Sequence, residues 1–248
     1  MSRQLLIYKS AVPVSAARHG DVSVEANDSF AFSADVNAVP LMAVEFPRAA
    51  AEYAIVFTAE GEEVMPAVIL GVRNSQNLFL SSDSRWKADY IPAFIRRYPF
   101  VFSSGDGKAL TLCIDESHPG VNRVGKGNAL FGADKKPTPY VEKVLEFLKE
   151  FQIQFERTRQ FCRSLKELQL LEPMQANVTT PQGENISLGG FLGIKRERLR
   201  QLSGEQLEKL VKTDELELLY LHLASLRNFT DFKDRIAGTH ADAETKAT

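Results

Sequence analysis

The architecture of this chain is decided by residues 138–171, TPYVEKVLEFLKEFQIQFERTRQFCRSLKELQLL. Thr138 can serve as an N-cap and Pro139 can occupy the first helical position. No glycine and no further proline follows, and apolar residues recur every three or four positions, which predicts one amphipathic helix. An unbroken helix of this length is about 45–50 Å long. Because globular helices are usually shorter, we expect it to kink, to span two parts of the fold or to pack against a second copy, and to stop at Pro173.

Before this helix, the sequence has the pattern of an antiparallel sheet with short helices. Short runs of β-forming residues alternate with turn residues, and short connections favour antiparallel pairing. One helix is expected to begin near Pro47. The expected strands are 22–24, 53–58, 64–72 and 77–80, with a hairpin that joins 100–103 to 109–114 through Gly105-Asp106-Gly107.

After the long helix, the pattern predicts a hairpin and a helical pair. Residues 178–194 look extended on both sides of a turn at Gly183. The two helices that follow are each marked by a capping box, Ser203 with Gln206 in the first and Asp214 with Glu217 in the second.

These elements predict the α+β class. We expect a β-rich α+β region at 1–137 and a mainly helical region at 138–237 that packs on it as one structural unit. Residues 238–248 are small and polar, and we expect them to be a disordered tail.

Composition excludes several classes of protein. The 248 residues are 44% hydrophobic and 25% charged with a formal charge of −2, which is ordinary for a globular protein and lacks the basic excess of a nucleic-acid or anionic-membrane binder. No apolar run approaches the roughly 18 residues of a membrane span, and no signal peptide is recognisable. Cys113 and Cys162 are the only cysteines, too few for a disulfide framework or a zinc site. We therefore expect a cytoplasmic protein.

A series of distinctive short segments occurs along the chain. They are Val39-Pro40-Leu41, Glu45-Phe46-Pro47, Ile55-Val56-Phe57, Asn77-Leu78-Phe79, Trp86, Tyr90-Ile91-Pro92, Arg96-Arg97-Tyr98-Pro99-Phe100, Leu130-Phe131 and His222-Leu223-Ala224-Ser225-Leu226. In this order they resemble the bacterial SapC family. The resemblance extends from about Val12 to Phe232, and its most specific part runs from Trp86 to Phe100.

The resemblance implies a cytoplasmic bacterial protein without an agreed biochemical activity. The family takes its name from a surface-layer gene cluster, and its members are expected near genes for outer-membrane uptake receptors, flavin-dependent halogenase-like proteins and cupin-like proteins. This neighbourhood implies nutrient uptake or surface-protein handling and assigns no catalytic residue. An unrelated transporter permease carries the same short name, but the lack of a membrane span excludes that meaning.

The segment from Trp86 to Phe100 is the strongest candidate for a binding site. An arginine beside aromatic residues can hold a carboxylate or phosphate through its planar fork, and aromatic side chains can stack on a ligand ring. In the structural alternative, the arginines pair with Glu45 or Asp89 and the indole fills the core. The candidate ligand-binding residues are Trp86, Tyr90, Arg96, Arg97 and Glu45.

Catalytic, metal and cofactor motifs are not recognisable in the sequence. Gly125-Lys126-Gly127 lacks the hydroxyl residue of a phosphate-binding loop, and the histidines lack metal-ligand spacing. His19 near Asp21 could be an acid–base pair, although a surface loop is the better interpretation. We therefore expect no catalytic residue, no metal and no cofactor.

Three hypotheses for function remain. We favour a non-enzymatic binding or accessory protein that recognises a small anionic or aromatic ligand or a protein partner, with self-association through the long helix as a homodimer. The first alternative is an enzyme, or an accessory subunit of a flavin- or iron-dependent partner. The second is a DNA-binding regulator that uses the basic stretch 195–200, although nucleic-acid binding is not favoured by the overall charge.

Overall fold

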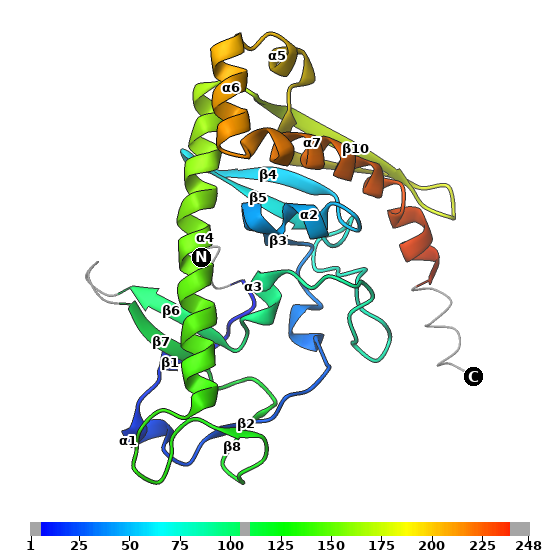
Figure 1. The fold of residues 1–248 in the computed structure, drawn as a ribbon. Helices are drawn as coiled ribbons and strands as arrows, with labels where there is room; N and C mark the ends of the chain where they lie inside the picture. Colours follow the sequence, from blue (N-terminus) through cyan, green and yellow to red (C-terminus); the bar gives the residue numbers. More distant parts are fainter. Residues whose placement is uncertain (1–5, 105–109, 239–248) are drawn as a thin grey trace.

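The largest layer of the protein is a five-stranded antiparallel sheet (Figure 1). The structure is a computed structural model that describes residues 6–104 and 110–238. Within those ranges the α+β class is confirmed. The central strands consist mostly of buried apolar residues, which is typical of strands that are covered by other elements. The strand order is β10 (Leu171–Thr179), β11 (Asn185–Ile194), β4 (Ile55–Glu60), β5 (Glu63–Ile69) and β3 (Ala38–Pro40).

The predicted long helix is α4 (Pro139–Glu167), which runs along one side of the molecule (Figure 1). The expected stop at Pro173 is wrong, because the helix ends six residues earlier. Gln169 takes a left-handed φ of 54°, and the amides of Gln169 and Leu170 donate to the carbonyls of Lys166 and Leu165 at 3.0 and 2.9 Å. This pattern is a Schellman motif, which ends a helix without proline. Pro173 lies inside β10, an edge strand that tolerates a missing N–H.

The C-terminal hairpin is longer than expected. β10 begins at Leu171, directly after the helix, rather than at 178, and it pairs with β11 across the turn at Gly183. A bulge between Met174 and Ala176 shifts the register of the two strands.

Two three-stranded sheets complete the β-structure. One has the order β1 (Ala11–Pro13), β7 (Leu110–Asp115), β6 (Phe100–Ser104), and the other β8 (Val121–Asn122), β2 (Ser23–Val24), β9 (Asn128–Ala129). The predicted pairing of β6 with β7 is confirmed, whereas its turn at Gly105-Asp106-Gly107 lies outside the described residues.

The strand expected at 77–80 is wrong. Only Leu80 forms an isolated bridge, to Trp86. Asn77 explains the difference, because its side-chain oxygen accepts from the amide of Phe79 at 3.0 Å and its amide group donates to the carbonyl of Ser33 at 3.0 Å. These local bonds compete with strand pairing and hold the segment as a turn.

Short helices connect the sheets. The helix expected near Pro47 is present as α2, and the capping box of Ser203 with Gln206 is confirmed at the start of α6. The short helices are α1 (Ala16–His19), α2 (Phe46–Ala49), α3 (Ala93–Arg96), α5 (Arg196–Arg200), α6 (Gly204–Lys212) and α7 (Glu215–Ser225), with 3-10 turns η2 (Ala31–Ser33), η3 (Ala43–Glu45) and η4 (Leu226–Phe229).

Two expectations near the C-terminus are corrected. Asp214 does not form a capping box with Glu217, because its φ of 59° is left-handed and its side chain makes no cap hydrogen bond. An N-cap residue normally has an extended backbone. Residues 232–238 are helical, so residue 238 does not begin a tail. The remainder of the expected tail, 239–248, lies outside the described residues.

Among the described residues the core consists of two hydrophobic clusters, and α4 contributes to both. Phe161 and Leu165 pack in the larger cluster with the five-stranded sheet, whereas Val141 and Leu148 pack in the smaller one with the two small sheets. Half-buried Phe147 touches both clusters. The long helix therefore spans two parts of the fold, which was one of the expected alternatives, and pairing with a second copy stays a prediction.

Candidate functional site

The segment from Trp86 to Phe100 links the large sheet to β6 and passes α4 near its middle (Figure 1). α3 contains Arg96 and is followed at once by Arg97. Successive helical residues point about 100° apart. The two arginines therefore reach different environments: Arg96 is exposed, whereas Arg97 is only 4% exposed.

A cavity of about 170 Å³ lies between η3, α2, α3 and the middle of α4. We call it the arginine pocket. It brings together Glu45, Tyr90 and Arg96, which are three of the five candidate residues. Its lining residues are Met42, Val44, Glu45, Arg48, Tyr90, Ala93, Arg96, Phe147, Glu150, Phe151 and Gln154.

Glu45 forms the inner wall of the arginine pocket and is 5% exposed. One carboxylate oxygen accepts from the Tyr90 hydroxyl at 2.6 Å and from the Ala93 amide at 2.7 Å, and the other accepts from the Met42 amide at 2.7 Å. Burial raises the pKa of the Glu45 carboxyl above its usual value, although these three hydrogen bonds and the positive charge of Arg96 oppose the rise. Glu45 is therefore hydrogen-bonded by neutral donors, and among the described residues Arg96 acts on it through its charge without forming an ion pair.

Arg48 and Arg96 lie at the mouth of the arginine pocket. Their guanidinium carbons are 5.4 and 5.9 Å from the centroid of the Tyr90 ring, and Arg96 is also 5.3 Å from that of Phe147. Arg96 is oriented further by a 2.9 Å hydrogen bond from Nε to the Ile91 carbonyl. Across residues 6–104 and 110–238, no carboxylate lies within ion-pair distance of either guanidinium. Two cations are thus held in place by aromatic rings and remain exposed to solvent.

Arg97 lies in the core and does not line the arginine pocket. Its guanidinium carbon is 4.3, 4.7 and 5.6 Å from the ring centroids of Phe94, Phe151 and Tyr8. Burial lowers the pKa of Arg97, and its interaction with Tyr8 opposes that change. This arginine joins the N-terminal segment to α3 and α4.

Trp86 also lies outside the arginine pocket. Its indole N–H donates to the Tyr53 hydroxyl at 2.8 Å, and its ring packs against Phe79 and Phe30 at centroid distances of 6.3 and 5.6 Å. The Tyr53 hydroxyl in turn donates to the carbonyl of Tyr90. Trp86 therefore supports the backbone that carries Tyr90, rather than contacting a ligand in the pocket.

Arg48, Phe147 and Gln154 were missed by sequence reasoning. A signal for Arg48 was available, since it lies three residues after Glu45 in a stretch expected to be helical near Pro47, and residues at that spacing share a face. Phe147 and Gln154 carried no such signal, because only tertiary packing brings α4 against Tyr90–Arg96, which lies far earlier in the chain.

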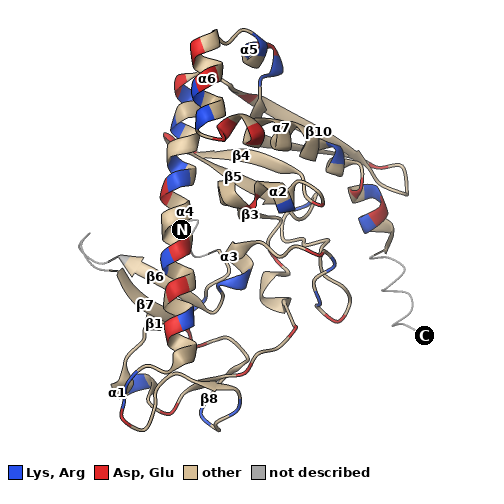
Figure 2. Cartoon of the chain, viewed as in Figure 1, with Lys and Arg blue, Asp and Glu red and all other residues tan. Residues whose placement is uncertain are grey.

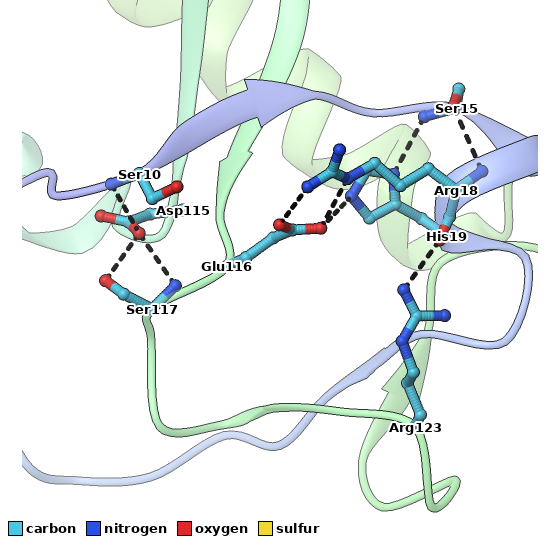
Figure 3. Close-up of polar contacts among 8 residues, drawn as sticks. All are labelled: Ser10, Ser15, Arg18, His19, Asp115, Glu116, Ser117 and Arg123. Atoms are coloured by element: carbon cyan, nitrogen blue, oxygen red, sulfur yellow. Dashed lines mark hydrogen bonds and ion pairs between the residues drawn. The ribbon is translucent and has the colours of Figure 1, made fainter.

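A second polar cluster surrounds His19 (Figure 3). The interpretation as a surface loop is wrong, because His19 is 0% exposed. Its Nδ1 accepts from the Ser15 amide at 3.2 Å, and its Nε2 lies 3.2 Å from Glu116. Asp21 is paired with Arg123 instead. The Ser15 hydroxyl accepts from the Arg18 amide, and the two ring nitrogens of His19 face the Ser15 amide and Glu116 rather than that hydroxyl.

The carboxylates of this cluster tie α1 and β1 to the end of β7. Glu116 accepts two hydrogen bonds from Arg18, at 2.8 and 2.6 Å, and these bonds are the largest cause that lowers its pKa to about 2. Next to it, buried Asp115 accepts from the Ser10 amide at 3.2 Å and from the Ser117 hydroxyl at 2.7 Å (Figure 3). It also accepts from the Lys9 amide at 2.6 Å. The arrangement is a structural connection between strands.

The basic stretch 195–200 contains α5. Arg198 donates from Nε to the carbonyl of Leu168 at 3.1 Å, so it satisfies an otherwise open carbonyl at the end of α4. Figure 2 shows acidic residues of α6 close to the basic residues of α5. DNA binding through this stretch stays a prediction.

Comparisons with known proteins point to one family. The model of the SapC family matches residues 14–232, which is most of the chain. No curated protein and no solved structure matches it significantly. Among the helices that the structure describes, none has both the length and the apolar character needed to cross a bilayer.

Proposed function

The chain belongs to the SapC family, and from that premise we propose that it is a binding protein whose arginine pocket holds the carboxylate of a small ligand. The observation that carries this proposal is the pair formed by Arg48 and Arg96. Both are exposed, both lie over the Tyr90 ring, and within the part of the chain that the structure describes neither forms an ion pair with a carboxylate.

A carboxylate is the group that best fits this pair. A guanidinium offers a planar fork of donors that matches the two oxygens of a carboxylate, and such charge-assisted hydrogen bonds are among the strongest in proteins. Because Arg96 is already oriented by the Ile91 carbonyl and by two rings, little of its side-chain freedom remains to be lost on binding.

The walls of the arginine pocket favour an aromatic or similarly compact ligand body. Tyr90 and Phe147 present rings, and Met42, Val44 and Ala93 add apolar contacts. For comparison, a cavity of about 150 Å³ engineered in another protein holds benzene. The volume of about 170 Å³ therefore suits a body the size of one ring.

Glu45 makes carboxylate binding dependent on pH. Its negative charge faces the same cavity as the two arginines, together with Glu150, which accepts from Gln154 at 2.7 Å. Because burial raises the pKa of Glu45, this carboxyl takes up a proton at a higher pH than an exposed glutamate. Protonation removes one repulsive charge and strengthens the binding of an anion.

The test is a titration of the labelled protein with benzoate, followed by amide chemical shifts. Shifts are expected at Tyr90–Arg96 and at Phe147–Gln154, the two segments that face the cavity. Benzoate that shifts no amide at millimolar concentration, or only amides far from these segments, would contradict the proposal.

The wider role that we propose is that of a bacterial, cytoplasmic accessory protein linked to nutrient uptake or surface-protein handling. This part is supported by membership of the SapC family. Localisation of a tagged chain by cell fractionation tests it, and recovery in a membrane or secreted fraction would contradict it.

A further inference from the structure

A second hollow adjoins the arginine pocket. It has a volume of about 470 Å³, lies between α4 and the junction of α6 with α7, and shares Val44 and Gln154 with the arginine pocket. Val44 is 59% exposed between the two. The two hollows therefore lie next to each other along α4, and we call them together the α4 groove.

The length of the α4 groove suits an extended peptide. Its lining on α4 runs from Phe147 to Phe161. At 1.5 Å per helical residue this stretch is roughly 21 Å long. An extended chain covers about 3.3 Å per residue, so about six residues span the groove.

The two ends of the α4 groove differ in charge. Arg48 and Arg96 lie at one end, with Glu45 and Glu150 on the walls behind them, whereas Asp214, Glu215 and Glu217 line the other, with Arg157 as a basic neighbour. Asp214 and Glu217 are exposed, and within the described residues no ion pair or hydrogen bond engages their carboxylates. Both ends thus present charges that a ligand could complement.

The middle of the α4 groove combines apolar and amide groups. Val44 and Leu218 offer apolar contacts, and the exposed side chain of Gln160 can bond to a peptide backbone. In such a complex, main-chain hydrogen bonds with Gln160 would add affinity, and side chains at each end of the peptide would give specificity.

We propose that the α4 groove binds an extended peptide of about six residues, with a carboxylate at Arg48 and Arg96 and a lysine or arginine side chain at Asp214 and Glu217. This inference rests on the proposed function, because the carboxylate of the peptide occupies the arginine pocket. The peptide carboxylate is either an acidic side chain or a free C-terminus.

The test compares hexapeptides by fluorescence anisotropy. The first has lysine at one end and glutamate at the other, and in the second glutamine replaces the lysine. Each is made with a free and with an amidated C-terminus, which separates the two sources of carboxylate. We expect the first peptide to bind at least tenfold more tightly than the second. Asp214→Asn and Glu217→Gln should abolish this difference and leave benzoate binding unchanged, whereas Glu197→Gln, at an exposed position of α5, should leave both unchanged.

Two results would overturn the inference while the proposed function stands. One is equal affinity for the two peptides together with benzoate binding that depends on Arg96. The other is the finding that the protein forms a dimer, that Val44→Asp dissociates this dimer and that no peptide competes with it. This finding would assign the α4 groove to a second copy of the chain. If neither benzoate nor any peptide binds, the inference and the proposed function fail together.

Discussion

The hydroxyl of Tyr90 donates a 2.6 Å hydrogen bond to the buried carboxylate of Glu45. The ring that lies beneath Arg48 and Arg96 is therefore anchored to a charge inside the protein. Two exposed cations, one aromatic ring and one buried anion form a connected set, so a change at any of them is expected to affect ligand affinity.

Removing either exposed arginine should weaken carboxylate binding without unfolding the protein. A hydrogen bond to a charged group contributes about 1.5–3 kcal/mol, so Arg48→Ala and Arg96→Ala should each lower benzoate affinity about tenfold or more. Their stability should change by less than about 0.5 kcal/mol because both side chains are exposed. Titration calorimetry and thermal unfolding measure the two effects.

Arg163→Ala is the matched control, since Arg163 is an exposed arginine of α4 that does not line the arginine pocket. An equal loss of affinity in this variant would show that the net charge of the protein, and not the pocket, determines binding.

Tyr90→Phe should destabilise the fold moderately. The substitution keeps the ring beneath the arginines but removes one of three donors to Glu45. A buried acceptor that loses a partner costs about 1–3 kcal/mol. Urea unfolding should show this loss, and the pKa of Glu45 should rise further, because the lost bond opposes the rise. Unchanged stability would mean that the hydroxyl is replaceable by solvent.

Anion binding should strengthen as the pH falls. The pKa of Glu45 is raised, so this carboxyl is ionised at high pH and gains a proton before an exposed glutamate does. Benzenesulfonate is a suitable probe because it stays ionised, so its affinity follows the protein alone. In the Glu45→Gln variant, the affinity for benzenesulfonate should not depend on pH and should equal the affinity that the wild-type protein reaches at low pH. A wild-type profile that is flat from pH 8 to 4, or one that rises with pH, would reject this role of Glu45.

Glu116 should stabilise the protein above pH 4.5. Hydrogen bonds from Arg18 lower its pKa from 4.5 to about 2 in the folded chain, so the folded state prefers the ionised form. That contribution is complete above the unfolded pKa and is lost as the pH falls through the folded one. Glu116→Gln should therefore lower the unfolding temperature at pH 6 and lose that effect towards pH 2. An identical difference at both pH values would exclude the linkage.

Cys162 should be unreactive in the folded protein. Burial raises the pKa of its thiol to about 12, so almost no thiolate is present at pH 7. Cys113 is also buried. A thiol reagent should find no rapidly reacting group under native conditions and two groups in guanidinium chloride. Fast reaction of one thiol in the native state would indicate local opening around α4.

The long helix was predictable because its apolar spacing is a local property of the sequence. The end of this helix was not predictable, because Gln169 adopts the left-handed conformation usually taken by glycine. The sequence also indicated that arginines and aromatic residues meet near Tyr90. It could not separate Arg96 from Arg97, because a rotation of about 100° along the chain decides which of the two neighbours faces the core. Phe147 and Gln154 join the site only through tertiary packing.

Phe147 touches both hydrophobic clusters and also lines the arginine pocket. The cavity thus lies where the two hydrophobic clusters meet along α4. If either part unfolded alone, α4 would lose its packing contacts with that part. Heating should therefore give a single cooperative unfolding transition. A ligand bound in the arginine pocket would raise the melting temperature of both parts together. A thermal-shift assay can therefore be used to screen for ligands of the protein.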